Sequence, residues 1–292
     1  MSPAIVNDLT LPASIPESQQ TPTNASHNAL FSLSNRLVVI TGGGRGLGIA
    51  LAAAVLEAGG HVACLDILKE PAAEEWTALQ NTAKHSNLEL SYRECDITNE
   101  GALEKIMDEL DEDAKRVGAQ FYGAVACAGI QQQMPAIDYP LEDFERIQRV
   151  NVTGTFLTAK HTARILTRNG VRGSIVLIAS MSGQIANRGL TCVAYNTSKA
   201  AVQQMCRSLA QEWGQFGIRV NTLSPGYIRT AMTDELLATA PELEKVWMAG
   251  ALLGRLGSPE DFKSPAIFLL SAGSSFMTGA DLRVDGGHCA SA

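Results

Sequence analysis

A tyrosine and a lysine four residues apart are the side chains in this sequence best placed to move a proton. Tyr195 and Lys199 lie in the stretch Tyr-Asn-Thr-Ser-Lys, which follows a helical pattern, so both side chains share one face of a helix. A phenol has a pKa near 10 and is a poor base at neutral pH. An ammonium about 4 Å away, at an effective dielectric of about 20, favours the phenolate by roughly 4 kcal/mol, or about 3 pKa units. The pair predicts a tyrosine that exchanges a proton with an alcohol or carbonyl oxygen near neutral pH, although this spacing also arises by chance on helices.

A glycine-rich turn follows the first apolar run and opens a helix. Glycine is required where the chain turns tightly, where backbone approaches a pyrophosphate, and where a helix packs close to a strand. The helix N-terminus then offers free N–H groups and a partial positive charge to phosphates. The turn therefore predicts a dinucleotide site. Its assigned residues are Gly42, Arg45, Gly46, Leu47 and Gly48.

The residue that ends the second predicted strand bears on which dinucleotide binds. Asp66 follows Gly48 by 18 residues, where a carboxylate accepts hydrogen bonds from the adenosine ribose and repels a 2′-phosphate. Arg45 acts in the opposite direction, because a cation in the glycine turn can pair with that phosphate. The carboxylate would meet the phosphate directly, so we expect NAD, with NADP as the alternative. Asp96 and Ile97, at the end of the third strand, are expected to flank the adenine.

Short β-branched runs alternate with longer helical stretches through most of the chain. The predicted strands cover 36–41, 61–66, 88–95, 121–128, 173–180, 217–224 and 281–285. The predicted helices cover 47–58, 71–84, 99–116, 141–169, 194–214 and 259–271. Nearly continuous apolar strands that alternate with helices are typical of a parallel sheet covered on both faces. The sequence therefore predicts one α/β domain over 34–292, a Rossmann-like doubly wound parallel sheet flanked by helices.

Residues 1–33 differ in composition from the rest of the chain. They hold four of the eleven prolines, many Ser, Thr, Asn and Gln, and no Lys or Arg. Such a segment buries too little apolar surface to offset its ordering entropy, so we expect a flexible N-terminal extension. It lacks the Arg-rich pattern of a mitochondrial presequence and the charged, apolar start of a secretory signal. A cytoplasmic location is the resulting expectation.

Charge and composition exclude several classes of protein. The net charge of −7, from 23 basic and 30 acidic residues, argues against a nucleic-acid partner bound through its phosphates. No apolar run reaches the roughly 18 residues that a membrane span requires. The six cysteines are scattered and include no Cys-x-x-Cys pair, so we expect reduced thiols and no metal site.

Several motifs, in order and spacing, make the sequence resemble the short-chain dehydrogenase/reductase family. They are TGGGRGLG, the aspartate that ends the second strand, VNVTG, GSIVLIAS, YNTSK and RVNTLSPGYIRT, and they span about residues 34–288. The resemblance implies that Tyr195 is the general acid/base and that Lys199 lowers its pKa and grips the nicotinamide ribose. It implies that Ser180 orients the reacting oxygen, with Ser182 as the nearby alternative. Asn151 would support a water relay towards Lys199.

The resemblance assigns two further stretches to the cofactor. The assigned residues are Ala128 and Gly129 after the fourth strand, and Pro225, Gly226, Ile228 and Thr230 in the turn that braces the nicotinamide carboxamide. The family usually has asparagine before the Ala-Gly pair, where this chain has Cys127. A thiol cannot supply the donors of an amide, so another group or a water is expected to compensate. Cys127 itself is expected to be a buried, inert thiol.

The activity implied by the resemblance is hydride transfer between NAD(H) and a secondary alcohol or ketone. The stretches IASMSGQIAN and SLAQEWGQFGIRVNTLSPGYIRT are similar to a fungal subgroup of mannitol dehydrogenase, sorbose reductase and arabinitol dehydrogenase. A small polyol or ketose is therefore the expected substrate. The candidate substrate residues are Ser182, Gln131, Gln184 and Trp247, the last of these in a candidate lid over about 231–256.

Two alternative functions stay open, and the resemblance also implies an assembly. The apolar side chains of 231–256 also suit an enzyme that tailors a bulkier fungal secondary metabolite. A non-redox protein that kept the cofactor-binding fold usually loses a catalytic Asn, Ser, Tyr or Lys, and all of these are present here. In the family, helices equivalent to 141–169 and 194–214 form a four-helix bundle between subunits, so we expect a homotetramer, with a dimer as second choice.

Overall fold

The computed structural model describes residues 26–229, 233, 237 and 242–291, and within them the strands form one parallel sheet. The seven strands lie in the order β3-β2-β1-β4-β5-β6-β7, so the order reverses between β1 and β4. Their bounds are β1 (Arg36–Thr41), β2 (His61–Asp66), β3 (Leu90–Glu94), β4 (Gln120–Ala126), β5 (Ser174–Ile178), β6 (Arg219–Pro225) and β7 (Asp281–Val284). This topology confirms the predicted Rossmann-like sheet. In such sheets, ligands bind outside the carboxyl ends of the strands, where the order reverses.

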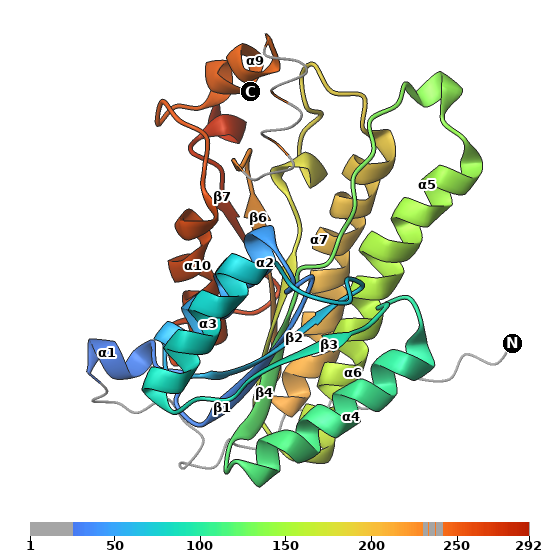
Figure 1. Cartoon of the computed structure of the whole chain (residues 1–292). Helices are drawn as coiled ribbons and strands as arrows, with labels where there is room; N and C mark the ends of the chain where they lie inside the picture. The colour runs from blue at the N-terminus through green and yellow to red at the C-terminus, as the bar shows by residue number, and fades with distance from the viewer. Residues whose placement is uncertain (1–25, 230–232, 234–236, 238–241, 292) are drawn as a thin grey trace, which may run out of the picture.

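Helices cover both faces of the sheet (Figure 1). One layer contains α2 (Gly46–Glu57), α3 (Ala73–Ser86) and α10 (Lys263–Leu270). The other contains α4 (Glu100–Arg116), α6 (Thr155–Arg168) and α7 (Val193–Trp213), with α5 (Leu141–Gln148) packed against α7. The two layers explain why central strands are apolar throughout: all five residues of β5 are buried.

The predicted helix over 141–169 is interrupted in the structure. Between α5 and α6 lies η3 (Arg149–Gly154), a π-helical segment in which each turn holds more residues than an α-helical turn. A further short helix, α9 (Glu242–Gly250), falls within the predicted lid region and was not among the predicted helices. Residues 230–232, 234–236 and 238–241 of that region lie outside the described residues.

The predicted N-terminal extension falls mostly on residues 1–25, which lie outside the described part of the chain. The rest of it packs onto the domain. Helix α1 (His27–Leu30) leads into Phe31, whose ring centroid lies 6.4 Å from that of Phe268. Leu33 is fully buried and its N–H donates to the carbonyl of Ala58 at 2.8 Å. The packed structure therefore begins before residue 34.

All six cysteines are free thiols. Within the described ranges, no three His, Cys, Asp or Glu side chains are grouped so that they could hold a metal ion. No helix in this part of the chain combines the length and the apolar character needed to cross a membrane.

Candidate active site

The predicted catalytic residues come from three elements that meet at the carboxyl ends of the central strands. Tyr195 and Lys199 lie one turn apart in α7, and the Lys199 Nζ is 5.5 Å from the centroid of the Tyr195 ring. The Lys199 Nζ donates a hydrogen bond to the carbonyl of Ile178, the last residue of β5, at 2.8 Å. Ser180, two residues further on, is hydrogen-bonded through its side chain to Tyr195. The structure thus brings the tyrosine, the serine and the lysine together.

Burial changes the proton affinity of both members of the pair. It raises the pKa of Tyr195 to about 12, and the hydrogen bond from Ser180 lowers this value only in part. It lowers the pKa of Lys199 to about 8, because the buried ammonium loses its hydration. The expectation that the ammonium brings the tyrosine close to neutrality is therefore wrong for this structure. Desolvation is the largest cause of both shifts, and the Lys199 Nζ donates to the backbone carbonyl of Ile178.

Asn151 is fully buried within η3, and its amide is bonded to the backbone after β4. Its Oδ1 accepts from the Ile130 N–H at 2.8 Å, and its Nδ2 donates to the Ile130 carbonyl at 2.9 Å. The Nδ2 also donates to the Ser198 hydroxyl at 3.0 Å. At Gly129, a Cβ would lie 3.3 Å from the Asn151 Oδ1 and 3.6 Å from the Lys199 Nζ. Asn151 and Lys199 therefore face the same stretch of backbone.

The glycine turn has the close approaches that a phosphate-binding turn requires. At Gly48, a Cβ would lie 1.9 Å from the carbonyl oxygen of Gly42, so only glycine fits this turn. Gly42 has a φ of +68° and lies against Ala128, where a Cβ would come within 2.8 Å of backbone. In the described structure, α2 has no side-chain cap at Arg45, which leaves its first N–H groups open to an anion. These residues fit the pyrophosphate of a dinucleotide.

The other predicted residues of the turn are more exposed. Gly46 has a φ of +56°, and a Cβ there would meet no atom within 4 Å. Leu47 is partly buried, and Arg45 is exposed in extended backbone conformation. The glycine turn is therefore tightly packed at Gly48 and exposed to solvent at Arg45.

Asp66 is fixed against the same turn. Its Oδ2 accepts from the Gly44 N–H at 2.9 Å and its Oδ1 accepts from the Leu68 N–H at 3.2 Å. The carboxylate keeps free lone pairs, since an ionised carboxylate has about four acceptor positions. Asp66 is thus held where β2 ends, beside the turn, and can accept ribose hydroxyls.

The two residues predicted to flank the adenine differ in their surroundings. Asp96 is exposed, and its Oδ1 accepts from the N–H and the hydroxyl of Thr98 at 2.9 and 2.8 Å. Ile97 is buried against Gly154, where a Cβ would meet the Ile97 Cδ1 at 2.4 Å. The structure therefore places Asp96 at the surface, whereas Ile97 packs against η3.

The unusual Cys127 is compensated by a hydroxyl from β1. Burial raises the pKa of the Cys127 thiol to about 12, so the thiol stays protonated at neutral pH. Its neighbour Ala128 donates its N–H to the Thr41 Oγ1 at 3.4 Å, and the Cys127 N–H donates to the Thr41 carbonyl at 3.2 Å. Thr41 thus ties the ends of β1 and β4 together without an asparagine.

The turn after β6 lies close to β7. The Gly226 N–H donates to the Val284 carbonyl at 2.9 Å, and a Cβ at Gly226 would lie 2.7 Å from the Asp285 Cα. Pro225 ends β6, and Ile228 bridges to Gly257. Thr230 lies outside the described residues.

Comparison with known proteins agrees with this geometry. A family model described as enoyl-(acyl carrier protein) reductase matches residues 42–288. The short chain dehydrogenases/reductase notP' of Aspergillus versicolor is 47% identical over 271 residues, which cover 90% of each chain. The chain belongs to the short-chain dehydrogenase/reductase family. The resemblance predicted from its motifs is confirmed, and the protein is an oxidoreductase of a family that uses nicotinamide dinucleotides.

Two other relatives of this short-chain dehydrogenase/reductase are named for different substrates. D-arabinitol 2-dehydrogenase (ribulose-forming) of Candida tropicalis is 36% identical over 267 residues, which cover 88% of this chain and 94% of that protein. The crystal structure of NADPH-dependent 3-quinuclidinone reductase from Rhodotorula rubra has a TM-score of 0.82 and 36% identity, covering 94% of this chain and 99% of that one. The family thus carries both polyol and cyclic ketone chemistry.

The predicted substrate residues of this protein differ in burial and in their hydrogen-bond partners. Ser182 is buried, and its N–H donates to the Ser180 Oγ at 3.1 Å. Ser182 therefore helps to hold the side chain of Ser180 in place. Gln131 is exposed after β4. The Gln184 side chain is bonded to Asp281 and Arg283 of β7. Gln184 is therefore engaged within the protein.

Trp247 is also engaged within the protein. It is only 2% exposed and its ring stacks on Tyr227 with centroids 4.3 Å apart and planes 11° from parallel. Tyr227 directly follows the Pro-Gly turn, and its hydroxyl accepts a hydrogen bond from the Asn187 Nδ2 at 3.1 Å. Sequence reasoning had not singled out Tyr227, although an aromatic residue directly after the turn was the available signal.

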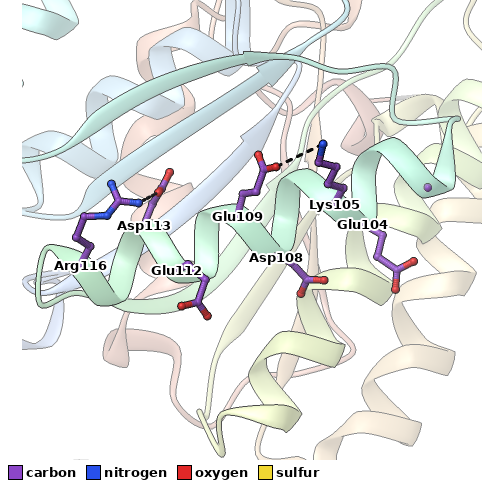
Figure 2. Close-up of a pocket in the computed structure, with 8 residues that line it drawn as sticks. Glu104, Lys105, Asp108, Glu109, Glu112, Asp113 and Arg116 are labelled. Atoms are coloured by element: carbon purple, nitrogen blue, oxygen red, sulfur yellow. Dashed lines mark hydrogen bonds and ion pairs between the residues drawn. The ribbon is translucent and has the colours of Figure 1, made fainter.

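The open hollow along α4 is a charged helix surface. Figure 2 shows that its lining comes from α4 alone. Two of its carboxylates hold the neighbouring helix, since Glu104 pairs with Arg164 at 2.6 Å and Asp108 pairs with Arg168 at 2.9 Å. None of the candidate catalytic or cofactor residues lines this hollow.

Proposed function

We propose that this protein transfers a hydride between NAD(H) and the secondary alcohol or ketone carbon of a small polyol or ketose. The observation that carries the proposal is the meeting of Tyr195, Ser180 and Lys199 at the carboxyl end of β5, which neighbours β4 at the point where the sheet order reverses. Ala128 and Gly129 connect this group to the glycine turn, since Gly42 lies against the first and Lys199 faces the second. The nicotinamide and the substrate carbon, between which the hydride moves, can therefore be held side by side.

Each residue has a defined task in this proposal. Tyr195 donates its proton to the carbonyl oxygen in reduction and takes it back in oxidation, while Ser180 hydrogen-bonds the same oxygen. Lys199 supplies positive charge beside the phenol and a donor to the nicotinamide ribose. Asn151 holds the backbone at Ile130, and with it the wall of the site. The nicotinamide, when bound, supplies or accepts the hydride.

The raised pKa of Tyr195 keeps the phenol protonated at neutral pH, which is the form that reduction requires. A phenol with a pKa of about 12 holds its proton and can act as an acid. Oxidation requires the phenolate, so it is expected to become faster as the pH rises.

The choice of NAD over NADP rests on Asp66. Its carboxylate is fixed beside the glycine turn by two backbone N–H groups and would repel a 2′-phosphate. Arg45 is exposed and free of a capping role, which keeps NADP as the alternative. The named use of NADPH by the Rhodotorula rubra relative supports that alternative.

A bulkier cyclic ketone is a second candidate substrate. The half-buried ring of Tyr227 adds aromatic surface near the turn after β6, and Gln184 is bonded to β7. Both observations favour a less polar ligand, and a relative that is named for 3-quinuclidinone fits them. The Candida tropicalis relative, named for D-arabinitol, supports the polyol.

We further propose a homotetramer in the cytoplasm. The apolar side chains of Leu141, Phe156 and Val193 are exposed on α5, α6 and α7, the helices that the family uses between subunits. Free thiols at all six cysteines support a reducing compartment.

The test is nicotinamide absorbance on mixing the protein with NADH or NADPH and a panel of ketoses and cyclic ketones. The reverse reaction uses the oxidised cofactors and the matching alcohols. Turnover of a ketose with NADH is the expected result. Turnover of cyclic ketones alone would select the second candidate, and no turnover with any member would contradict a redox function.

A further inference from the structure

Segments far apart in the sequence meet around the ring of Tyr227. One face of the ring stacks on Trp247 of α9, and His288 of η8 (His288–Ala290) approaches edge-on with centroids 5.0 Å apart and planes at 88°. The hydroxyl accepts its hydrogen bond from Asn187, in the loop between β5 and α7. Because neighbouring rings hold it in place, the phenol cannot turn its hydroxyl to water without breaking these contacts.

Asn187 connects this aromatic cluster to the start of α7. It is 6% exposed, and its Oδ1 lies 3.8 Å from the Sγ of Cys192, which precedes the first residue of α7. The same thiol lies 3.1 Å from the Oδ1 of Asn196 within the first turns of the helix. Tyr195 is the neighbour of Asn196. A continuous path of side-chain contacts thus runs from Trp247 to the turn that carries Tyr195.

Helix α9 also packs directly on the loop that holds Asn187. At Gly189, a Cβ would lie 3.4 Å from Leu243 and 3.6 Å from Val246, both on α9. The loop therefore contacts α9 through its backbone and through the amide of Asn187. Any shift of α9 relative to β6 has to be accommodated by this loop.

We propose that Asn187 is a positioning residue that couples the seating of α9 to the start of α7, and so to the orientation of Tyr195. The proposal rests on the proposed function in that Tyr195 carries the proton transfer. Removing the amide takes the donor away from the hydroxyl of the half-buried Tyr227, which is costly for a polar group that is partly shielded from water. Both ends of the path are then expected to loosen, although the glycine turn assigned to the pyrophosphate lies on other elements, between β1 and α2.

The first test is a double-mutant cycle on ketone reduction. Asn187→Ala and Tyr227→Phe are each expected to lower kcat/KM about 10-fold, the effect of about one lost hydrogen bond, with the dissociation constant for NADH unchanged. Because both variants break the same bond, the double variant is expected to lose little more than either single one. Losses that multiply, to about 100-fold, would overturn the proposal.

Tyr139→Phe is the matched control. Its hydroxyl is buried but has no hydrogen-bond partner among the described residues, so its removal is expected to change kcat/KM less than 2-fold. A loss from Tyr139→Phe as large as that from Tyr227→Phe would overturn the proposal, because it would show that deleting any buried phenol hydroxyl here lowers activity.

The second test does not depend on activity. Amide hydrogen exchange is compared between the full-length protein and its Asn187→Ala variant in two segments, 187–192 and 242–250. Faster exchange in both segments is the expected result. A change confined to 187–192 would overturn the coupling. If the wild type turns over no substrate but the two segments loosen together, the proposed function fails while the coupling stands.

Discussion

Tyr195 and Lys199 lie one turn apart on α7, and burial shifts the pKa of both side chains. It raises the pKa of the phenol to about 12 and lowers that of the amine to about 8, so each group is driven towards its neutral form. A neutral phenol that is hydrogen-bonded to Ser180 is an acid ready to protonate an oxygen. The amine contributes its charge only below about pH 8.

The first prediction concerns Lys199→Met and the pH dependence of stability. The folded-state pKa of Lys199, about 8, lies below its ordinary value of 10.5, so the unfolded chain binds the extra proton between these pH values. Wild-type stability should therefore rise with pH in this window, relative to the methionine variant. At pH 7 the variant is expected to be more stable by about 2 kcal/mol. This value is the free-energy cost of burying the ammonium minus the contribution of the lost hydrogen bond to Ile178.

Denaturant unfolding of both proteins at pH 7 and pH 9.5 measures this difference. The advantage of the variant is expected to shrink by more than half at the higher pH. An advantage that stays constant, or a wild type that is more stable at pH 7, would show that Lys199 is not a destabilised buried ammonium.

At the scale of elements, the turn between β1 and α2 is the part of the fold proposed to hold the pyrophosphate of the cofactor. Gly48 lies on the first turn of α2, directly over the carbonyl of Gly42. The same few residues reverse the chain, pack the helix on the strand and expose its N–H groups. A change at Gly48 therefore acts on packing and on phosphate binding together.

The second prediction concerns Gly48→Ala. Since the new Cβ would lie 1.9 Å from a backbone oxygen, the turn has to move, and we expect NADH affinity to fall by at least about 100-fold in calorimetric titration. Gly101→Ala is the control, because Gly101 is also near the start of a helix but a Cβ there meets no atom within 4 Å. The control should bind NADH normally and gain up to about 1 kcal/mol of stability. Unchanged NADH binding by Gly48→Ala would contradict the assignment of the glycine turn to the pyrophosphate.

Most elements could be predicted from the sequence because their signals are local. Apolar β-branched runs, the glycine turn and helical periodicity suffice to locate β1, β2 and α7 to within a residue or two. The π-helical turn of η3 could not be predicted, because no pattern of residues distinguishes it from the α-helix on either side. Helix α9 lies in the stretch predicted as a candidate lid, for which no helix bounds were predicted.

The grouping of the candidate site residues could be predicted where a motif fixes the residue, and less so where partners distant in the sequence hold the side chain. Tyr195, Lys199 and Ser180 come together as their motifs indicated. Gln184 looked free for substrate, but its partners Asp281 and Arg283 are about 100 residues away in the sequence. The pKa values also depend on burial in the folded protein, which spacing on a helix does not reveal.

At the scale of the whole molecule, two groups of exposed large apolar side chains bear on assembly. Leu141, Phe156 and Val193 lie on the helices of one layer, being 71%, 40% and 38% exposed. Leu252 and Leu253 follow α9, with 64% and 73% of each exposed. Exposure of this kind fits surfaces that subunits cover in an assembly.

The third prediction is therefore a tetramer in solution, with a mass about four times the 31.0 kDa of one chain. Phe156→Glu is expected to split it, because a carboxylate cannot be buried between apolar helices. Phe216→Glu, at a similarly exposed phenylalanine on η5 (Gly214–Phe216), serves as the control and should leave the mass unchanged. Light scattering at micromolar concentration measures both, and a monomeric wild type would refute the assembly.

The fourth and most direct measurement follows NADH oxidation by a ketose in a single turnover, with the wild type and Tyr195→Phe. The variant keeps the ring and loses the acidic hydroxyl, so its rate is expected to fall by about 100- to 10,000-fold, while its affinity for NADH stays within about 3-fold. If Tyr195→Phe instead oxidises NADH within a few-fold of the wild-type rate, another group donates the proton, and the assignment of Tyr195 is contradicted.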